Sequence, residues 1–217
     1  MARRLATSPR QLRRIPLRLV FLLGLLAAAA HGATNAIPAH LEQALAGVRT
    51  VRTRFLQEKR VALFKQPLVT RGTIQVAPPD KLLWRVESPI RYALLVDGRQ
   101  ARQWDGETGK TEKIALAGNP VFAAVTEQLG AWFGGRYRLL AATYDISPSP
   151  DQPESFVFTP RPETPQAAVV KAVTVTFRGD GRYIAAIRID ERGGDTTLLT
   201  FEATEINVPL DAEAWTL

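Results

Sequence analysis

The chain contains few side chains that could serve as nucleophiles, general bases or metal ligands. It has no cysteine, and its only histidines are His31 and His40. A thiolate nucleophile is therefore absent, and a metal site built from cysteine or several histidine ligands cannot be assembled. His40 stands in the first turn of an expected amphipathic helix, where a solvated side chain is more common than a general base. We expect no catalytic residue, no cofactor and no metal, and we predict that the protein is not an enzyme.

The acidic residues are explained better by turns than by catalysis. Asp97, Asp105 and Asp180 each precede a glycine, which is the pattern of tight hairpins. A glycosidase pair such as Glu87 and Asp105 stays open, but no spacing selects it. The sequence has neither a Gly-x-Ser-x-Gly nucleophile elbow nor a glycine loop for phosphate.

The positive charge is concentrated at the start of the chain. The formal net charge is +7 and the isoelectric point is near 10.1. Six arginines precede an apolar run from Leu19 to Ala30: Arg3, Arg4, Arg10, Arg13, Arg14 and Arg18. A basic segment, a short apolar run and small residues predict a signal peptide over residues 1–32, cleaved between Ala30 and Ala36. The apolar run is shorter than the roughly 20 residues that span a bilayer, although an uncleaved anchor stays open.

Export changes how the remaining composition is interpreted. Removing the six arginines leaves 22 of the 28 basic side chains against 21 acidic ones, a balance that gives no reason to expect nucleic-acid binding. Without cysteine, the exported chain can form neither a disulfide nor a cysteine-linked lipid anchor. We therefore expect one periplasmic or secreted domain over residues 37–217.

Most of this domain has the two-residue apolar period of β-strands. A long strand over 50–63 places Val51 and Phe55 on one side and Arg52 and Arg54 on the other. Further strands are predicted over 68–77, 81–87, 92–96, 101–105, 110–116, 138–145, 155–159, 172–178, 183–190 and 195–207. Because short turns join most of them, we expect an antiparallel meander. Arg52, Arg54 and Arg60 share one face of the first strand, either as a solvated surface or as a contact for anionic headgroups or an acidic partner.

Two helices are predicted, over 38–48 and over 119–129. In the second, Asn119 supplies a cap and Pro120 the first helical position. Glycines at positions 130, 134 and 135 then surround Trp132 and Phe133. The sequence leaves open whether this region is an ordinary helix that caps the sheet or a movable lid with glycine-rich joints.

About ten strands with few helices predict a mainly β (α+β) fold, in which a curled antiparallel sheet needs a cover for its apolar face. The candidate inner-face residues alternate along successive strands: Phe55, Ile74, Val76, Leu82, Trp84, Val86, Leu94 and Val96. Periodicity alone does not distinguish a packed core from a cavity kept for a ligand.

The segment from Gly72 to Gly98 contains strands that are apolar on one face, separated by prolines and followed by an Asp-Gly turn. Its landmarks, in order, are Gly72, Pro79, Leu82 with Trp84, Pro89, and Leu94 to Val96 running into Asp97-Gly98. A looser pattern follows in Ser155 to Pro160 and in the Gly179-Asp180-Gly181 turn. In this order of features, from about Leu41 onward, the chain resembles the LolA family of periplasmic outer-membrane lipoprotein carriers.

The resemblance implies an incomplete β-barrel lidded by helices, with a hydrophobic cavity for acyl chains. It implies a periplasmic, monomeric carrier that takes lipoproteins from an inner-membrane release complex to an outer-membrane acceptor. Four further aromatic residues become candidates for the cavity wall and lid beside Phe55 and Trp84: Trp104, Phe122, Trp132 and Phe133.

The chain departs from the family pattern at Pro78. Members of the family typically carry an arginine at this position, immediately before the proline, and it latches the lid. Arg85 or Arg91 could substitute, but both lie elsewhere in the pattern. An alternative is therefore a LolA-like paralogue that carries or senses another acylated or polyene lipid. A solute-binding or scaffold module with a filled core is a third possibility.

Overall fold

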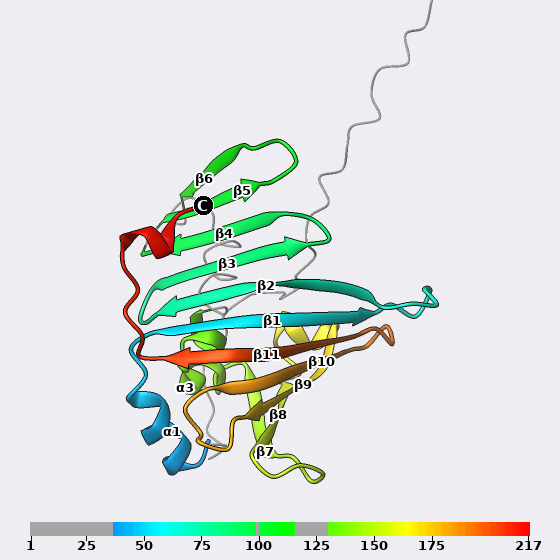
Figure 1. Ribbon diagram of the computed structural model, residues 1–217. Helices are drawn as coiled ribbons and strands as arrows, with labels where there is room; N and C mark the ends of the chain where they lie inside the picture. The colour runs from blue at the N-terminus through cyan, green and yellow to red at the C-terminus, as the bar shows by residue number, and fades with distance from the viewer. Residues whose placement is uncertain (1–36, 99, 116–129) are drawn as a thin grey trace, which may run out of the picture.

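The computed structural model describes residues 37–98, 100–115 and 130–217, which form one antiparallel sheet with short helices (Figure 1). The strands are β1 (Val51–Arg60), β2 (Leu68–Ala77), β3 (Lys81–Ser88), β4 (Tyr92–Asp97), β5 (Gln100–Asp105), β6 (Thr111–Ala115), β7 (Tyr144–Pro148), β8 (Ser155–Pro160), β9 (Val170–Phe177), β10 (Ile184–Glu191) and β11 (Thr196–Ile206). The helical segments are α1 (Ala39–Ala46), α3 (Tyr137–Leu140), η2 (Pro165–Ala168) and η3 (Ala212–Trp215). None of these helices is long and apolar enough to cross a bilayer.

The sheet order is β6-β5-β4-β3-β2-β1-β11-β10-β9-β8-β7. Two meanders, β1 to β6 and β7 to β11, are joined where β1 pairs with β11 in the middle of the sheet. The edge strands β6 and β7 therefore lie at opposite ends, and the sheet is not closed. This confirms the predicted fold class. Because β6 precedes β7 in the chain, the connection between them has to pass from one edge to the other.

The predicted strand over 138–145 is wrong in its first half. Tyr137–Leu140 forms α3, and β7 begins only at Tyr144. A one-turn helix lets Tyr137 and Leu140, three residues apart, bury their side chains on the same side. The long first strand ends at Arg60 rather than at residue 63. The predicted signal peptide and the helix over 119–129 lie outside the described residues.

Strand β1 shows how the two faces are specified. Val51, Thr53, Phe55 and Gln57 are buried, whereas Arg54 is exposed, as the two-residue period predicts. Val51 and Phe55 of β1 join the large core on the inner face, with side chains from nearly every other strand and α1. Residues 131–133, Tyr137 and Leu140, which precede β7 in the chain, lie on this face.

The outer face of β3 and β4 is covered by the C-terminal segment. Trp215 of η3 packs with Leu83, Ala93 and Leu95 in a second, smaller cluster. Lys81 lies 4.8 Å from the centre of the Trp215 ring, a cation–π distance. The Asp211 side chain accepts a hydrogen bond from the Ala214 amide and so caps η3. Residues 82–84 of β3 are consequently buried on both faces.

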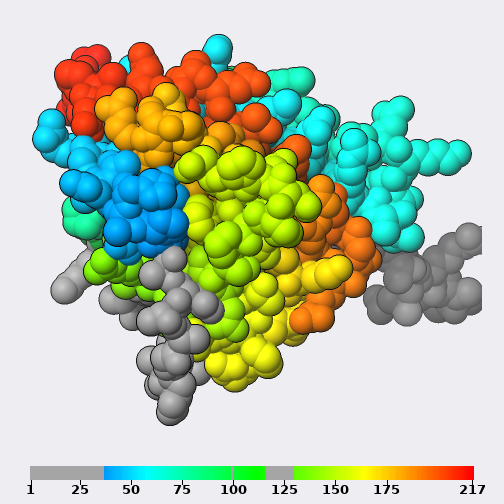
Figure 2. All heavy atoms as spheres, turned by 90° about the horizontal axis from the view of Figure 1, so that it is seen from below, coloured from blue at the N-terminus to red at the C-terminus, as the bar shows by residue number. Residues whose placement is uncertain are grey.

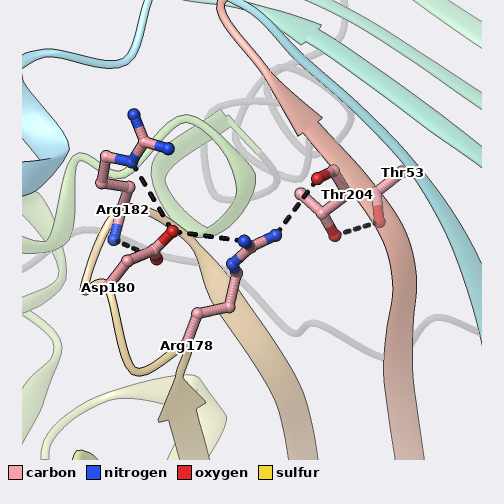
Figure 3. Close-up of polar contacts among 5 residues, drawn as sticks. All are labelled: Thr53, Arg178, Asp180, Arg182 and Thr204. Atoms are coloured by element: carbon pink, nitrogen blue, oxygen red, sulfur yellow. Dashed lines mark hydrogen bonds and ion pairs between the residues drawn. The ribbon is translucent and has the colours of Figure 1, made fainter.

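A polar network joins the β9–β10 turn to the centre of the sheet (Figure 3). Arg178 donates to the Thr204 carbonyl oxygen at 3.1 Å and to Asp180 at 3.2 Å. Thr204 and the buried Thr53 share a hydroxyl hydrogen bond of 2.8 Å. Asp180 also accepts from the Arg182 amide at 3.1 Å. The turn is thereby fixed to β11, and through Thr204 to β1.

Gly72 of β2 lies where no side chain can be accommodated. A Cβ atom there would collide with the Arg85 carbonyl oxygen and lie 2.9 Å from Cε1 of Phe55. Phe55 needs this space because its ring packs on Trp84 at a centroid distance of 5.3 Å. The first landmark glycine of the Gly72–Gly98 segment is therefore a packing requirement of the inner face.

We predict that Gly72→Ala lowers the free energy of unfolding by about 3 kcal/mol, because the Arg85 backbone and the Phe55 ring must both move. Gly193→Ala is the matched control, since a Cβ atom there meets nothing within 4 Å. Urea denaturation monitored by circular dichroism measures both variants. Equal stability of the two would contradict the packing role of Gly72.

Candidate functional site

Eight of the predicted wall residues lie together on the inner face of β1 to β4. All are buried, with at most 8% of each side chain exposed, and all belong to one hydrophobic cluster: Phe55, Ile74, Val76, Leu82, Trp84, Val86, Leu94 and Val96. Their common direction follows from strand alternation. Their role in binding a ligand stays a prediction.

Strand register arranges most of these side chains in rows across the sheet. Trp84 stands opposite Ile74 on one side and Leu94 on the other, and Leu82 stands opposite Val76 and Val96. Directly opposed residues have Cβ atoms about 5 Å apart, so each row is a continuous apolar strip. Together the rows form an apolar surface about three strands wide.

Trp104 does not join this group. It lies half-buried on the outer face, packed against the cluster of Leu83, Ala93, Leu95 and Trp215. The reason is register, because Trp104 stands opposite Ala93, which also points outward. Ala101 is the β5 residue that reaches the inner core. Phe122, another predicted wall or lid residue, lies outside the described part of the chain.

Trp132 and Phe133 come from the connection that crosses the inner face. Phe133 packs on Trp84 of β3 at a ring-centroid distance of 5.4 Å and on Phe201 of β11 at 5.9 Å. Trp132 packs on Phe158 of β8 at 4.9 Å. All these pairs meet edge to face, the favoured arrangement for aromatic rings. Two adjacent residues thus bridge the two meanders, and we call residues 130–140 the crossing segment.

The glycines of the crossing segment form a helix end rather than a loose joint. The Gly134 amide donates to the Gly130 carbonyl at 2.9 Å, and the Arg136 amide donates to the Ala131 carbonyl at 2.9 Å. Gly135 has a φ of +71°. A left-handed glycine with this six-residue hydrogen bond is a Schellman-type C-cap. The cap fixes the direction in which the turn carrying Trp132 and Phe133 ends.

The crossing segment is tied to α1 at the surface. The Arg138 guanidinium donates to both carboxylate oxygens of Glu42, with Nε to Oε1 at 2.7 Å. This hydrogen bond lowers the pKa of Glu42 and raises that of Arg138. Figure 2 shows α1 in blue beside lime atoms of the chain that follows Gly130. Because Arg138 is well exposed, the pair contributes little to stability but sets how the two elements meet.

Several aromatic residues of the inner face were not predicted. Phe158, Phe201, Tyr137, Tyr144 and Tyr183 are all buried there. Phe158 and Phe201 could have been identified from the two-residue alternation of their strands, as Phe55 was. Tyr137 could not, because its segment was assigned to a strand.

Two tyrosine hydroxyls are buried without a hydrogen-bond partner among the described residues, those of Tyr137 and Tyr183. Burial, with a smaller contribution from Tyr183, raises the pKa of Tyr137 well above its ordinary value. Burial likewise raises the pKa of Tyr183, and that of Tyr92 to about 12. The inner face therefore holds polar atoms inside an otherwise apolar surface.

The described residues offer no metal site and give the glycosidase pair no support. No three His, Cys, Asp or Glu side chains among them are grouped to hold an ion. The Asp105 carboxylate accepts hydrogen bonds from the Glu107 and Thr108 amides at 2.8 and 3.0 Å. The bond from Thr108, then that from Glu107, lowers its pKa, as suits a turn residue rather than a general acid.

We predict that the protein loses stability between about pH 10 and pH 12. Below pH 10, Tyr92, Tyr137 and Tyr183 are protonated in both the folded and the unfolded chain. Above pH 10, the unfolded chain releases protons from these tyrosines that the folded chain retains. Each such tyrosine lowers the free energy of unfolding by up to about 1.4 kcal/mol per pH unit. Urea denaturation across this pH range, with tyrosinate absorbance, measures the effect.

Tyr183→Phe is the diagnostic variant. Since the hydroxyl has no partner among the described residues, its removal should leave stability at neutral pH unchanged or slightly higher and should reduce the loss above pH 10. A clear loss of stability at neutral pH would contradict the unpartnered hydroxyl.

Comparison with known proteins gives a family match and relatives that carry the same name. A family model described as outer membrane lipoprotein carrier protein LolA matches residues 46–217. The outer-membrane lipoprotein carrier protein of Cupriavidus taiwanensis is 26% identical over 187 residues, which cover 82% of this chain and 84% of that protein. The protein of the same name from Chromohalobacter salexigens is 24% identical over 147 residues. That match covers 67% of this chain and 65% of the relative, less than two thirds of its length.

Among solved structures, a chain of the Pseudomonas aeruginosa MucA/MucB complex aligns with a TM-score of 0.50 and 13% identity. The alignment covers 82% of this chain and 58% of that one, and it is a likeness of fold alone. The family match is a match in sequence, and it includes every described strand and the whole crossing segment. The chain therefore belongs to the LolA family of outer membrane lipoprotein carrier proteins.

Proposed function

We propose that the protein is a periplasmic carrier that holds the acyl chains of lipoproteins against its inner face and moves them from the inner to the outer membrane. Membership of the LolA family supports this function, as do the relatives named outer-membrane lipoprotein carrier proteins. The observation that carries it is the continuous aromatic and aliphatic surface under the crossing segment. The signal peptide predicted over residues 1–32 would bring the chain to the periplasm, and an inner-membrane donor complex and an outer-membrane acceptor would be its partners.

The energetics favour a guest that displaces the crossing segment. Each methylene moved from water to an apolar surface contributes about 0.8 kcal/mol, so the chains of one lipoprotein supply on the order of tens of kcal/mol. The two ring contacts of Phe133, with Trp84 and Phe201, contribute about 1–3 kcal/mol beyond burial. A few methylenes offset the loss of these ring contacts, and the remaining methylenes offset the lost burial of side chains such as Trp132 and Phe133. The protein's own side chains would close the inner face between deliveries without preventing entry.

A second candidate follows from Pro78, which replaces the arginine expected from the family pattern. Arg85 donates to the Thr216 carbonyl, and Arg91 lies 5.8 Å from the Trp104 ring centre, so both are engaged on the outer face. Neither supports the role of a latch, which the Arg138–Glu42 pair is better placed to perform. A different latch is compatible with a different cargo, namely another acylated or polyene lipid.

Acyl binding at the inner face is tested by fluorescence quenching with a brominated fatty acid. The four tryptophans divide evenly, because Trp84 and Trp132 lie inside whereas Trp104 and Trp215 lie outside. We expect Trp104→Phe/Trp215→Phe, which retains the inner pair, to be quenched as strongly as the wild type. Trp84→Phe/Trp132→Phe, which retains the outer pair, should show almost no quenching. Equal quenching of both variants would contradict binding at the inner face. Absence of quenching in the wild type would contradict the acyl-carrier function.

The cargo is tested by mass spectrometry of protein purified from the periplasm without detergent. We expect a lipid-modified N-terminal peptide to copurify, because a carrier in transit retains its guest. Recovery of free lipid alone would favour the second candidate. Phe133→Asp places a charge on the inner face and serves as the empty control.

A further inference from the structure

The loop between β1 and β2 projects beyond one end of the sheet (Figure 1). Its large apolar side chains are exposed. Leu63 is 90% exposed and Phe64 is 58% exposed. Leu68, at the start of β2, is 51% exposed. We call residues 61–68 the tip. Apolar side chains that are exposed together, rather than scattered singly, ordinarily mark a surface that contacts something else.

The tip is braced at its base. The Phe64 amide donates to the Val61 carbonyl at 2.9 Å, which closes a tight turn. The Ala62 amide donates to the Asp195 carboxylate at 2.9 Å. Lys59 bonds Glu191 at 2.9 Å. The neighbouring β10–β11 turn thus supports the tip, which holds Leu63 and Phe64 outward on a firm base.

The charge around the tip is positive. Residues 58–71 contain four basic side chains and only one acidic one, Glu58. Lys59 is engaged with Glu191, but Arg60, Lys65 and Arg71 are exposed and form no ion pair with a described residue. Such free cations next to protruding apolar groups match an anionic lipid surface, where the cations meet phosphates and the apolar groups enter the acyl boundary.

The size of the tip favours a bilayer over a protein as its binding partner. A stable protein interface buries about 800 Å² on each side, across roughly 20 or more residues. The tip offers two or three apolar side chains on one narrow turn, too few for such an interface but sufficient for insertion at a membrane surface. We propose that residues 61–68 form a reversible docking tip, which inserts Leu63 and Phe64 into bilayers that contain anionic headgroups.

The proposal is tested by flotation of the full-length mature protein with vesicles. The vesicles contain phosphatidylethanolamine and phosphatidylglycerol, or phosphatidylcholine alone as the uncharged comparison. We expect binding to the anionic vesicles, weakened by salt because screening reduces the attraction. Leu63→Glu and Phe64→Glu should each lower the partition coefficient about tenfold or more. Leu139→Glu is the matched control, since Leu139 is 50% exposed on α3, away from the tip, and this change should leave binding unaltered.

A second measurement locates the contact. Because the chain has no cysteine, Phe64→Cys carries a single environment-sensitive dye, whose emission should shift to the blue on anionic vesicles. A dye at Leu139→Cys should not respond.

Three results would overturn the proposal. They are absence of wild-type binding to anionic vesicles, unaltered binding by both tip variants, and binding only to native membranes that is lost after protease treatment. The last would identify a protein partner instead. Quenching of Trp84 and Trp132 by the brominated fatty acid is measured without vesicles, so failure of the carrier function and failure of the docking tip are separate outcomes.

Discussion

The pairing of β1 with β11 is the constraint on which the rest of the structure depends. It joins two meanders at the middle of the sheet and places β6 and β7 at opposite edges. In the described part of the chain that leads to β7, the crossing segment lies on the face where the apolar side chains gather. Trp132 and Phe133 are therefore positioned by topology as much as by their own packing. The strand order leaves β6 and β7 far apart, and the packing of Trp132 and Phe133 places the crossing segment over the inner face.

The two faces of the sheet are covered in different ways. The C-terminal segment packs Trp215 against the outer face, with Lys81 over its ring and Arg85 bonded to Thr216. The inner face is covered by a one-turn helix, a glycine cap and edge-to-face aromatic contacts. Such contacts are individually weak, and an acyl chain can replace them. The inner cover is thus the one that a lipid guest could exchange with its own hydrocarbon at small net cost.

The polar networks among the described residues align the elements of the fold. Arg178, Asp180, Thr204 and Thr53 fix the β9–β10 turn to the sheet, and Arg138 with Glu42 sets α1 against the crossing segment. Asp105 satisfies the amides of its own turn. The proposed docking tip stands apart from these networks, where its side chains are free to meet another surface. Cargo binding and membrane docking would accordingly use different ends of the same strand, β1.

The sequence by itself determined the local features. Alternation identified the eight inner-face residues of β1 to β4, and Asp-Gly pairs identified the turns, because both signals depend only on neighbouring residues. The lack of cysteine and the scarcity of histidine likewise limited the chemistry that the side chains can perform, because composition does not depend on folding. Only the tertiary structure decided that β1 meets β11, that Trp104 points outward opposite Ala93, and that Tyr137 belongs to a helix joined to α1 through Arg138 and Glu42. These features depend on which distant segments come together. A two-residue apolar period predicts that one face of a strand is buried, but it does not predict what covers that face.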